Sequence, residues 1–182
     1  MLIKFPEETL DALALQALLA EPPTDLHIYH AVDHQETYAW LSTPVDVNAL
    51  QAALQVSHPQ ASIVRLTLTT DVAGHSAGQP APWFYVVETD IKSGAQEDFD
   101  RWYETEHLPG LAAVPGTVRA RRYLARESSP LFYACYDLAQ REAFGSPAWL
   151  AVRATSWSDR VRPNFINTKR TMFRLVHAIK KA

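Results

Sequence analysis

The chain has 182 residues, 47% of them apolar and 20% charged, which suits one or two globular domains and excludes a disordered tail or a collagen-like repeat. The formal net charge is −3 and no dense basic stretch occurs, so we expect no nucleic-acid partner. A single cysteine, Cys135, excludes an intrachain disulfide and favours a reducing cytoplasm. No signal-peptide pattern and no apolar run near the roughly 20 residues that span a bilayer is present, so we expect no membrane partner.

The first part of the chain predicts the order strand, helix, strand, strand, helix, strand. Apolar residues recur at helical spacing behind Thr9, which we expect to be the N-cap, and the Pro22-Pro23 pair ends that helix. The expected elements are a strand at 2–5, a helix at 10–18, a hairpin of strands at 26–32 and 38–41, a helix at 46–56 and a strand at 63–69.

A stretch rich in Gly, Ser and Pro at 72–82 breaks every hydrophobic period and is predicted as a linker. The same order of elements then returns. The expected elements are a strand at 83–87, a helix at 95–108, a turn at Pro115-Gly116, a hairpin of strands at 117–125 and 131–138, an interrupted helical region from Gln140, and a strand at 167–179.

This repeated pattern predicts an α+β fold of two tandem ferredoxin-like βαββαβ units, an N-terminal unit at 1–71 and a C-terminal unit at 83–182. Each unit has an antiparallel sheet with both helices on one face, which leaves the other face bare. We expect the two bare faces to pack sheet to sheet within one chain, as an intramolecular α/β barrel. The first part is net acidic and the second net basic, which favours this docking. The alternative is that each half pairs with another chain, so both a monomer and a homodimer remain open.

One stretch carries a resemblance to a known family. Residues 97–116 read EDFDRWYETEHLPGLAAVPG, with Trp-Tyr, Glu-His-Leu-Pro and Pro-Gly at fixed intervals, and Arg121-Arg122-Tyr123 follows. This pattern resembles the dimeric α/β-barrel superfamily, in particular its EthD-like members. The resemblance covers residues 83–176, whereas residues 1–71 match only in element order, as a degenerate copy in a tandem duplication would.

The resemblance implies two back-to-back sheets around a small apolar to amphipathic cavity. Relatives include cofactor-free monooxygenases of aromatic polyketides, polyketide cyclases, lactone isomerases and haem-dependent enzymes, so the fold alone does not decide the function.

His107 is the strongest catalytic candidate. It follows Tyr103 by four residues on the expected helix, so both side chains share one face and form an acid/base pair suited to moving a proton on an enolisable substrate. The alternative is a structural role, because a His in the last helical turn caps free carbonyls and Pro109 is expected to end the helix. At such a helix end we expect the pKa of His107 to be raised. The neighbouring Glu106 is expected to be solvated or paired with an Arg.

Trp102, Arg121 and Glu88 are the candidate substrate-binding residues. Glu88 lies on one strand face with Phe84 and Val86, which aims it either at the helices or at the barrel lumen. A lumen that contains Arg121 would give this carboxylate a partner, and a solvated strand end is the alternative.

Metal and haem are both expected to be absent. On the expected strand His27 points away from His30, and His34 lies too far along for three ligands to converge. A haem ligand would have to be His107 or come from the first half, because His177 is the one His in the later strands.

These residues favour a small-molecule cyclase, isomerase or monooxygenase that works without a cofactor. His107 would be the acid/base, Tyr103 its hydroxyl neighbour, and an Arg would hold an anionic group of the substrate. The alternative is a non-catalytic module of the same fold that binds a small molecule or a protein, which the scarcity of catalytic residue types in the strands favours.

Overall fold

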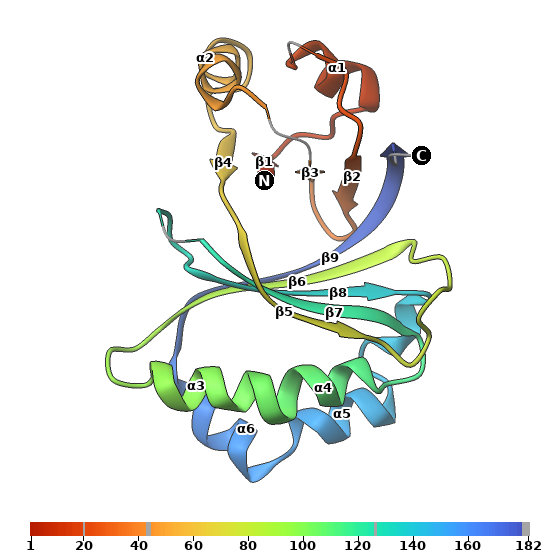
Figure 1. The fold of residues 1–182 in the computed structure, drawn as a ribbon, viewed down its shortest axis with the longest axis vertical. Coiled ribbons are helices and arrows are strands. Elements are labelled where there is room, and N and C mark those ends of the chain that lie inside the picture. Colours follow the sequence, from red (N-terminus) through yellow and green to blue (C-terminus); the bar gives the residue numbers. More distant parts are fainter. Residues whose placement is uncertain (20, 43–44, 126, 180–182) are drawn as a thin grey trace. The chain divides into compact units, whose positions relative to one another are not determined.

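The structure is a computed structural model and describes residues 1–19, 21–42, 45–125 and 127–179. Two compact units make up the chain. Unit 1 contains Met1–Leu66 and Met172–Ala182, and unit 2 contains Thr67–Thr171. The long last strand, β9 (Phe165–Ile179), therefore contributes its first residues to unit 2 and its later residues to unit 1. Figure 1 shows the elements of both units along the chain.

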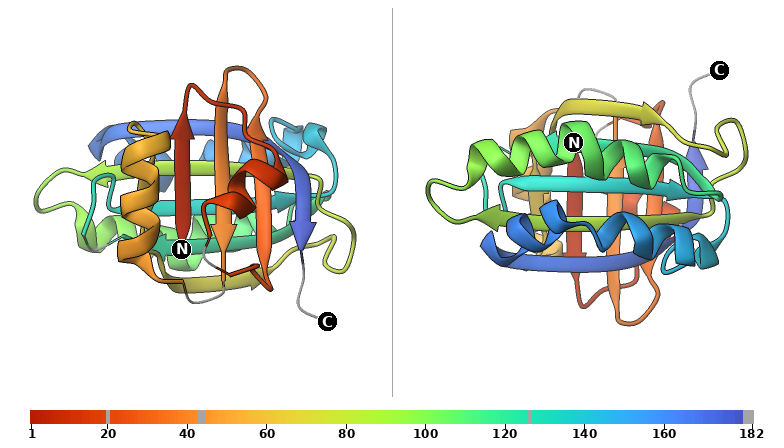
Figure 2. Two further views of the ribbon diagram at one scale, coloured as in Figure 1. Left: turned by 90° about the horizontal axis from the view of Figure 1, so that it is seen from above. Right: turned by 90° about the horizontal axis from the view of Figure 1, so that it is seen from below.

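Unit 1 has helices α1 and α2 on one face of an antiparallel sheet (Figure 2, left). Its strands follow the order β4-β1-β3-β2-β9. Asp46 caps α2 by accepting from two backbone N–H groups, and Asp11 caps α1, so the N-cap expected at Thr9 was placed two residues too early. The elements are β1 (Leu2–Pro6), α1 (Ala12–Ala17), β2 (Leu26–Ala31), β3 (Glu36–Leu41), α2 (Val47–Ser57) and β4 (Ser62–Val64).

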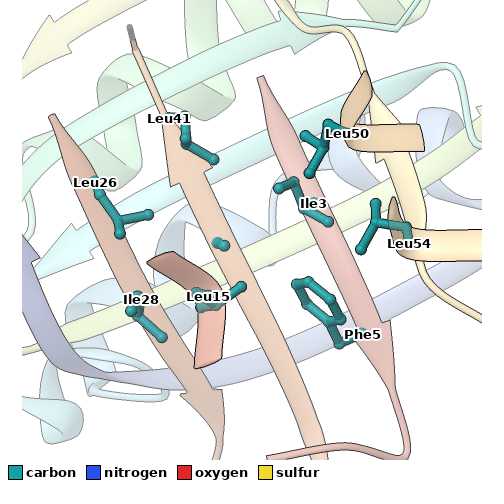
Figure 3. Packing of buried hydrophobic residues seen from close by; sticks show 9 residues of the cluster. Ile3, Phe5, Leu15, Leu26, Ile28, Leu41, Leu50 and Leu54 are labelled. Carbon is teal, nitrogen blue, oxygen red and sulfur yellow. The ribbon is translucent and has the colours of Figure 1, made fainter. Parts of the chain in front are cut away.

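The core of unit 1 lies between that sheet face and its two helices (Figure 3). Alternate residues of each strand enter it because successive side chains of a strand point to opposite faces. The cluster contains Ile3, Phe5, Leu15, Leu26, Ile28, Ala39, Leu41, Leu50 and Leu54.

Unit 2 has its helices on one face of the sheet β9-β6-β8-β7-β5 (Figures 1 and 2, right). One continuous helical segment follows β6, and two short helices precede β9. The elements are β5 (Thr67–Ala73), β6 (Trp83–Ile91), α3 (Gln96–Trp102), a π-helical segment (Tyr103–His107), α4 (Leu108–Ala112), β7 (Thr117–Leu124), β8 (Phe132–Leu138), a 3₁₀ turn (Arg141–Ala143), α5 (Pro147–Arg153), α6 (Ser156–Val161), a second 3₁₀ turn (Arg162–Asn164) and β9.

Both units have the predicted βαββαβ order. In each, the fourth strand lies beside the first, the first beside the third and the third beside the second, which gives β4-β1-β3-β2 in unit 1 and β9-β6-β8-β7 in unit 2. This strand order is that of the ferredoxin-like fold. The α+β class and the ferredoxin-like topology are therefore confirmed, whereas packing of the two sheets against each other stays a prediction.

The boundary between the units differs from the predicted one. The strand expected at 63–69 is two strands, and the second of them, β5, pairs with β7 and belongs to unit 2. At the other end of the chain, β9 from Phe173 onward pairs with β2 in unit 1. Alternation of apolar residues shows that a strand exists but not which partner it pairs with. The sequence pattern therefore did not show that β5 belongs to unit 2 or that the end of β9 belongs to unit 1.

The predicted linker at 72–82 is a packed part of unit 2. It begins inside β5, and the backbone N–H of Gly74 donates to Val118. A Cβ at Gly74 would lie 2.1 Å from the carbonyl oxygen of Thr117, so this position requires glycine. Ser76 accepts from the backbone N–H of Gly116 at 2.9 Å. Turn-forming residues here serve close packing rather than a free connection.

Among the described residues, no helix is both long enough and apolar enough to cross a membrane.

Candidate functional site

The helical segment that carries His107 does not end at Pro109 as expected. A π turn spans Tyr103–His107, in which the N–H of Leu108 donates to the carbonyl oxygen of Tyr103, and the chain continues as α4. Proline is accepted here because it stands in the first turn of the new helix, where its missing N–H costs little. π turns of this kind occur frequently at functional sites.

The π turn places His107 inside unit 2. The imidazole is 7% exposed and stacks on Trp102, with ring centroids 4.0 Å apart and planes at 19°. Tyr103 meets the same ring edge-on at 5.3 Å. The Nδ1 atom of His107 is buried and has no hydrogen-bond partner among the described residues. The structure therefore brings Tyr103 beside His107, as their spacing of four residues predicted, and it also brings Trp102 against the imidazole, which that spacing did not predict.

Burial determines the charge state of His107. Desolvation, followed by the positive charges of Arg153 and Arg162, lowers its pKa from 6.5 to about 3. The expected increase at a helix end was wrong, because the helix continues past His107 and the ring is removed from water. The imidazole is neutral at pH 7, so one ring nitrogen donates and the other accepts.

His107 lines a cavity between the sheet of unit 2 and its helices. The cavity encloses about 360 Å³ with its mouth included, and its free interior of about 30 Å³ has room for at least one water. Aromatic rings form most of its wall. The lining residues are Tyr85, Val87, Trp102, Tyr103, His107, Leu111, Tyr136, Trp149, Arg153, Arg162, Phe165 and Arg170.

Three arginines make this cavity electropositive. Arg153 ends α5, Arg162 begins the second 3₁₀ turn and Arg170 lies on β9. Burial and the charges of the other two lower the pKa of Arg162. Within the described part of the chain, none of the three has an acidic side chain within salt-bridge distance. An anion in the cavity would supply the missing negative charge.

Trp102 is fixed by a network that the sequence did not reveal. Its Nε1 donates to Glu106 at 3.2 Å, and the hydroxyl of Thr155 donates to the same carboxylate oxygen at 2.6 Å. Thr155 is also the N-cap of α6. The expectation of a solvated or Arg-paired Glu106 was therefore wrong, since this carboxylate joins the π segment to the start of α6.

Arg121 and Glu88 do not lie with His107. Val87 lines the cavity, so the alternation of β6 directs Glu88 to the opposite sheet face, where Tyr133 donates a hydrogen bond to it. Arg121 likewise faces away from the helices and binds Asp137 at 2.6 Å. The predicted substrate-binding group thus separates onto two faces of one sheet, and only Trp102 lies in the cavity.

Arg122 occupies the helix-covered face instead of Arg121. Its guanidinium lies 4.7 Å from the ring centre of Tyr103 and 4.6 Å from that of Phe99, and it binds Asp100 at 2.5 Å. This buried cation holds the Tyr103 ring in place. Burial raises the pKa of Tyr103, so its phenol is neutral at pH 7.

The histidines of unit 1 have other partners. His30 bonds the carbonyl oxygen of Leu10 at 2.8 Å, and His34 bonds Glu36 at 3.0 Å. His27 lies 3.3 Å from Asp25. No group of three or more His, Cys, Asp or Glu side chains suited to a metal ion occurs in the ranges that the structure describes.

Sequence reasoning missed most of the cavity wall. Tyr85, Tyr136, Trp149 and the three arginines were not identified as site residues. The net positive charge of the second part of the chain was the one available signal for the arginines, and it named no residue.

No protein-family model and no curated protein matches this sequence. Solved structures do match in fold. An anthrone oxidase-like protein is 14% identical, with a TM-score of 0.63 over 100% of this chain and 92% of that one. A ferredoxin-fold protein of Listeria monocytogenes related to antibiotic biosynthesis monooxygenases is 7% identical, with a TM-score of 0.58 over 97% and 95%. A heme-degrading enzyme of the same species is 8% identical, with a TM-score of 0.56 over 96% and 99%. At these identities the likeness shows a shared ferredoxin-like fold.

Proposed function

We propose that unit 2 binds a small anionic molecule in its cavity and that His107 moves a proton on it, without a cofactor. One observation carries this proposal: a buried, neutral imidazole lines the same cavity as three arginines. Among the residues that the structure describes, its Nδ1 has no hydrogen-bond partner and none of the three arginines forms a salt bridge. Tyr103 is the hydroxyl neighbour of this base.

The chemistry follows from the charges. A neutral imidazole accepts a proton from a C–H beside a carbonyl, and the electron pair left behind moves onto the carbonyl oxygen as an enolate. The arginines stabilise that negative charge. Return of the proton to another carbon gives an isomerase. Attack of the carbanion on a second carbonyl gives an alkoxide that takes the proton back from His107, which is a cyclase. Reaction of the carbanion with dioxygen oxidises the CH2 group to a carbonyl with one oxygen atom, while the other oxygen atom leaves as water with the two hydrogens, which is a monooxygenase.

Binding of an anion also prepares the base. Burial is the main cause of the low pKa of His107, and the charges of Arg153 and Arg162 lower it further. A ligand that neutralises the two arginines removes their part of the shift, which makes the imidazole a better proton acceptor.

Haem does not fit this cavity as the side chains stand. Even with its mouth included, the cavity of about 360 Å³ is smaller than a haem group. We therefore assign no step to haem, although one protein of similar fold is a heme-degrading enzyme.

The second candidate is a binding module without catalysis. The low pKa of His107 favours it, because a group that protonates only near pH 3 is a weak base in the absence of a ligand.

We further propose an EthD-like tandem duplication with a single small-molecule site, in unit 2. Its support is that residues 1–71 contain no counterpart of the Glu-His-Leu-Pro and Pro-Gly segments. The lone cysteine supports a cytoplasmic location.

Hydrogen–deuterium exchange tests the proton transfer. The protein is incubated in D2O with each of a panel of enolisable carboxylates, and NMR records how fast the acidic C–H of the ligand is replaced by C–D. We expect His107→Ala to slow exchange at least about 100-fold. His75→Ala is the matched control, because His75 is exposed and outside the cavity. If His107→Ala still binds the ligand and exchanges its C–H at the wild-type rate, the catalytic role of His107 is wrong and the second candidate, a binding module without catalysis, is favoured.

A further inference from the structure

The inner wall of the cavity holds polar atoms that need a partner. Besides His107 Nδ1, the Tyr136 hydroxyl and the Trp149 indole N–H are buried without a hydrogen bond within the described part of the chain. Both residues are 1% exposed. A buried polar group left unpaired destabilises the folded protein, and native structures contain few of them. Three in one cavity indicate a place where water or a ligand supplies the bonds.

The chemistry of these atoms restricts the partner. The Trp149 N–H only donates, so the ligand atom near it must be an acceptor. Burial raises the pKa of Tyr136 well above its usual value, so its phenol stays neutral and also has a proton to donate. An uncharged oxygen, either a carbonyl or a hydroxyl, meets both requirements without bringing a charge into the apolar wall.

The three arginines select a different group. Arg170 is exposed, and Arg153 and Arg162 are half-buried, so these cations lie nearer solvent than the indole and the phenol. A carboxylate binds guanidinium groups through charge-assisted, often bidentate hydrogen bonds. An ammonium group here would be repelled by all three.

Aromatic rings form the wall that these groups share. Tyr85 is stacked with Tyr136 at 6.1 Å, and Trp149 meets Tyr136 edge-on at 5.3 Å and Tyr85 at 5.9 Å. Such a wall favours a flat aromatic ring over a flexible chain, because the ligand ring extends the same offset and edge-on contacts.

We propose that the ligand is an aromatic carboxylic acid with a second, uncharged oxygen: its carboxylate binds the arginines and its hydroxyl or carbonyl oxygen binds Trp149 and Tyr136. Its ring occupies the cavity together with the mouth, about 360 Å³ in all, and the side chains of the wall move apart to admit it, because the free interior of about 30 Å³ is smaller than such a ring. This inference rests on the proposed function for the location of the site and adds the class of ligand that the site selects.

Simple benzene derivatives separate the two requirements. The probes are 3- and 4-hydroxybenzoate, benzoate without the second oxygen, the matching hydroxybenzamides without the charge, and the matching hydroxybenzylamines with the opposite charge. Isothermal titration with the full chain gives each dissociation constant. We expect at least one hydroxybenzoate to bind about tenfold or more tighter than benzoate and its own amide, and the amines not to bind.

Two variants assign each preference to its residues. Arg162→Gln weakens hydroxybenzoate binding about tenfold to a hundredfold and leaves hydroxybenzamide binding unchanged. Tyr136→Phe brings hydroxybenzoate affinity close to that of benzoate. The same change raises the melting temperature of the free protein, because it deletes an unpaired hydroxyl, so a loss of affinity is not a folding defect. Arg101→Gln, at an exposed arginine of α3, is the charge control.

Several results would overturn the inference: equal affinity for acid and amide, no effect of the hydroxyl, tighter binding of the amine, or no saturable binding of any probe at millimolar concentration. The proposed function fails separately. If His107→Ala keeps the ligand preferences and also keeps proton exchange, the ligand class stands and the catalytic role is lost. If the wild type, but not His107→Ala, exchanges the C–H of a neutral ligand, and if the acids bind no tighter than their amides, the catalytic role stands and the ligand class is wrong.

Discussion

Trp102 and His107 are stacked with ring planes at 19°, although they stand five positions apart. In a regular α-helix two such residues point about 140° apart around the axis. The π turn at Tyr103–His107 is what brings the rings together. The indole therefore covers one face of the imidazole, which holds the ring at a fixed orientation toward the cavity.

The pKa of His107 predicts a specific loss of stability in mild acid. The pKa is about 3 in the folded protein against 6.5 ordinarily, so between these values the unfolded chain binds a proton that the folded protein does not. Stability from this group is full above pH 6.5 and falls as the pH decreases toward 3. Between pH 7 and pH 5 we expect the free energy of unfolding to fall by about 2 kcal/mol more in the wild type than in His107→Gln.

Urea unfolding of both proteins at the two pH values measures this difference. All other titratable groups are the same in both proteins, so the comparison isolates the contribution of His107. Parallel pH profiles would show that His107 is not held neutral by its surroundings.

Glu106 is expected to stabilise the helical segment through its two donors. Glu106→Ala leaves the buried Trp102 N–H without its acceptor, and we expect a loss of about 1–3 kcal/mol in the free energy of unfolding. Glu104→Ala, an exposed position in the same π segment, should change it by less than about 0.5 kcal/mol. Chemical denaturation distinguishes them, and equal losses would mean that the Glu106 bonds contribute no net stability.

The purified protein is expected to be colourless and to keep its melting temperature in EDTA. The reasons are that His27, His30 and His34 each have another partner and that the free interior of the cavity is small. Absorbance near the haem Soret region and thermal melts with and without chelator give the answer. A Soret band, or a melting temperature several degrees lower in EDTA, would require a bound haem or metal.

We predict that the helix-free sheet faces of the two units pair within one chain. Cross-linking of an equal mixture of ¹⁴N- and ¹⁵N-labelled protein, analysed by mass spectrometry, tests this. Cross-links between the two units should join peptides of the same isotope. Links of mixed isotope between the units would show that each half pairs with a second copy instead.

The sequence predicted the elements well because the evidence for them is local. The alternation of Leu26, Ile28 and His30 and the spacing of Leu50 and Leu54 are visible without any partner, and β2 and α2 lie where these patterns predicted. Pro109 misled the prediction because proline either ends a helix or stands in the first turn of the next one, and only the π turn before it distinguishes the two.

The candidate site was less predictable because it depends on which residues meet in space. His107, Tyr103 and Trp102 are neighbours in sequence, so one motif identified all three. Arg162 and Tyr136 come from separate elements, and no local pattern relates them. Arg121 was chosen where its neighbour Arg122 faces the helices, a difference of one residue that reverses the sheet face.

β5 pairs with β7 of unit 2, and the end of β9 pairs with β2 of unit 1. Dividing the chain at one point therefore cannot give two fragments that each contain all strands of one unit. A fragment ending at Leu66 lacks the strand that covers β2, and a fragment beginning at Trp83 lacks the strand that covers β7. Each fragment would then present an open edge that invites pairing with other chains. The repeated order of elements suggests two modules that could be separated at one point of the chain, but the strand pairing shows that each half would lose a strand partner if they were.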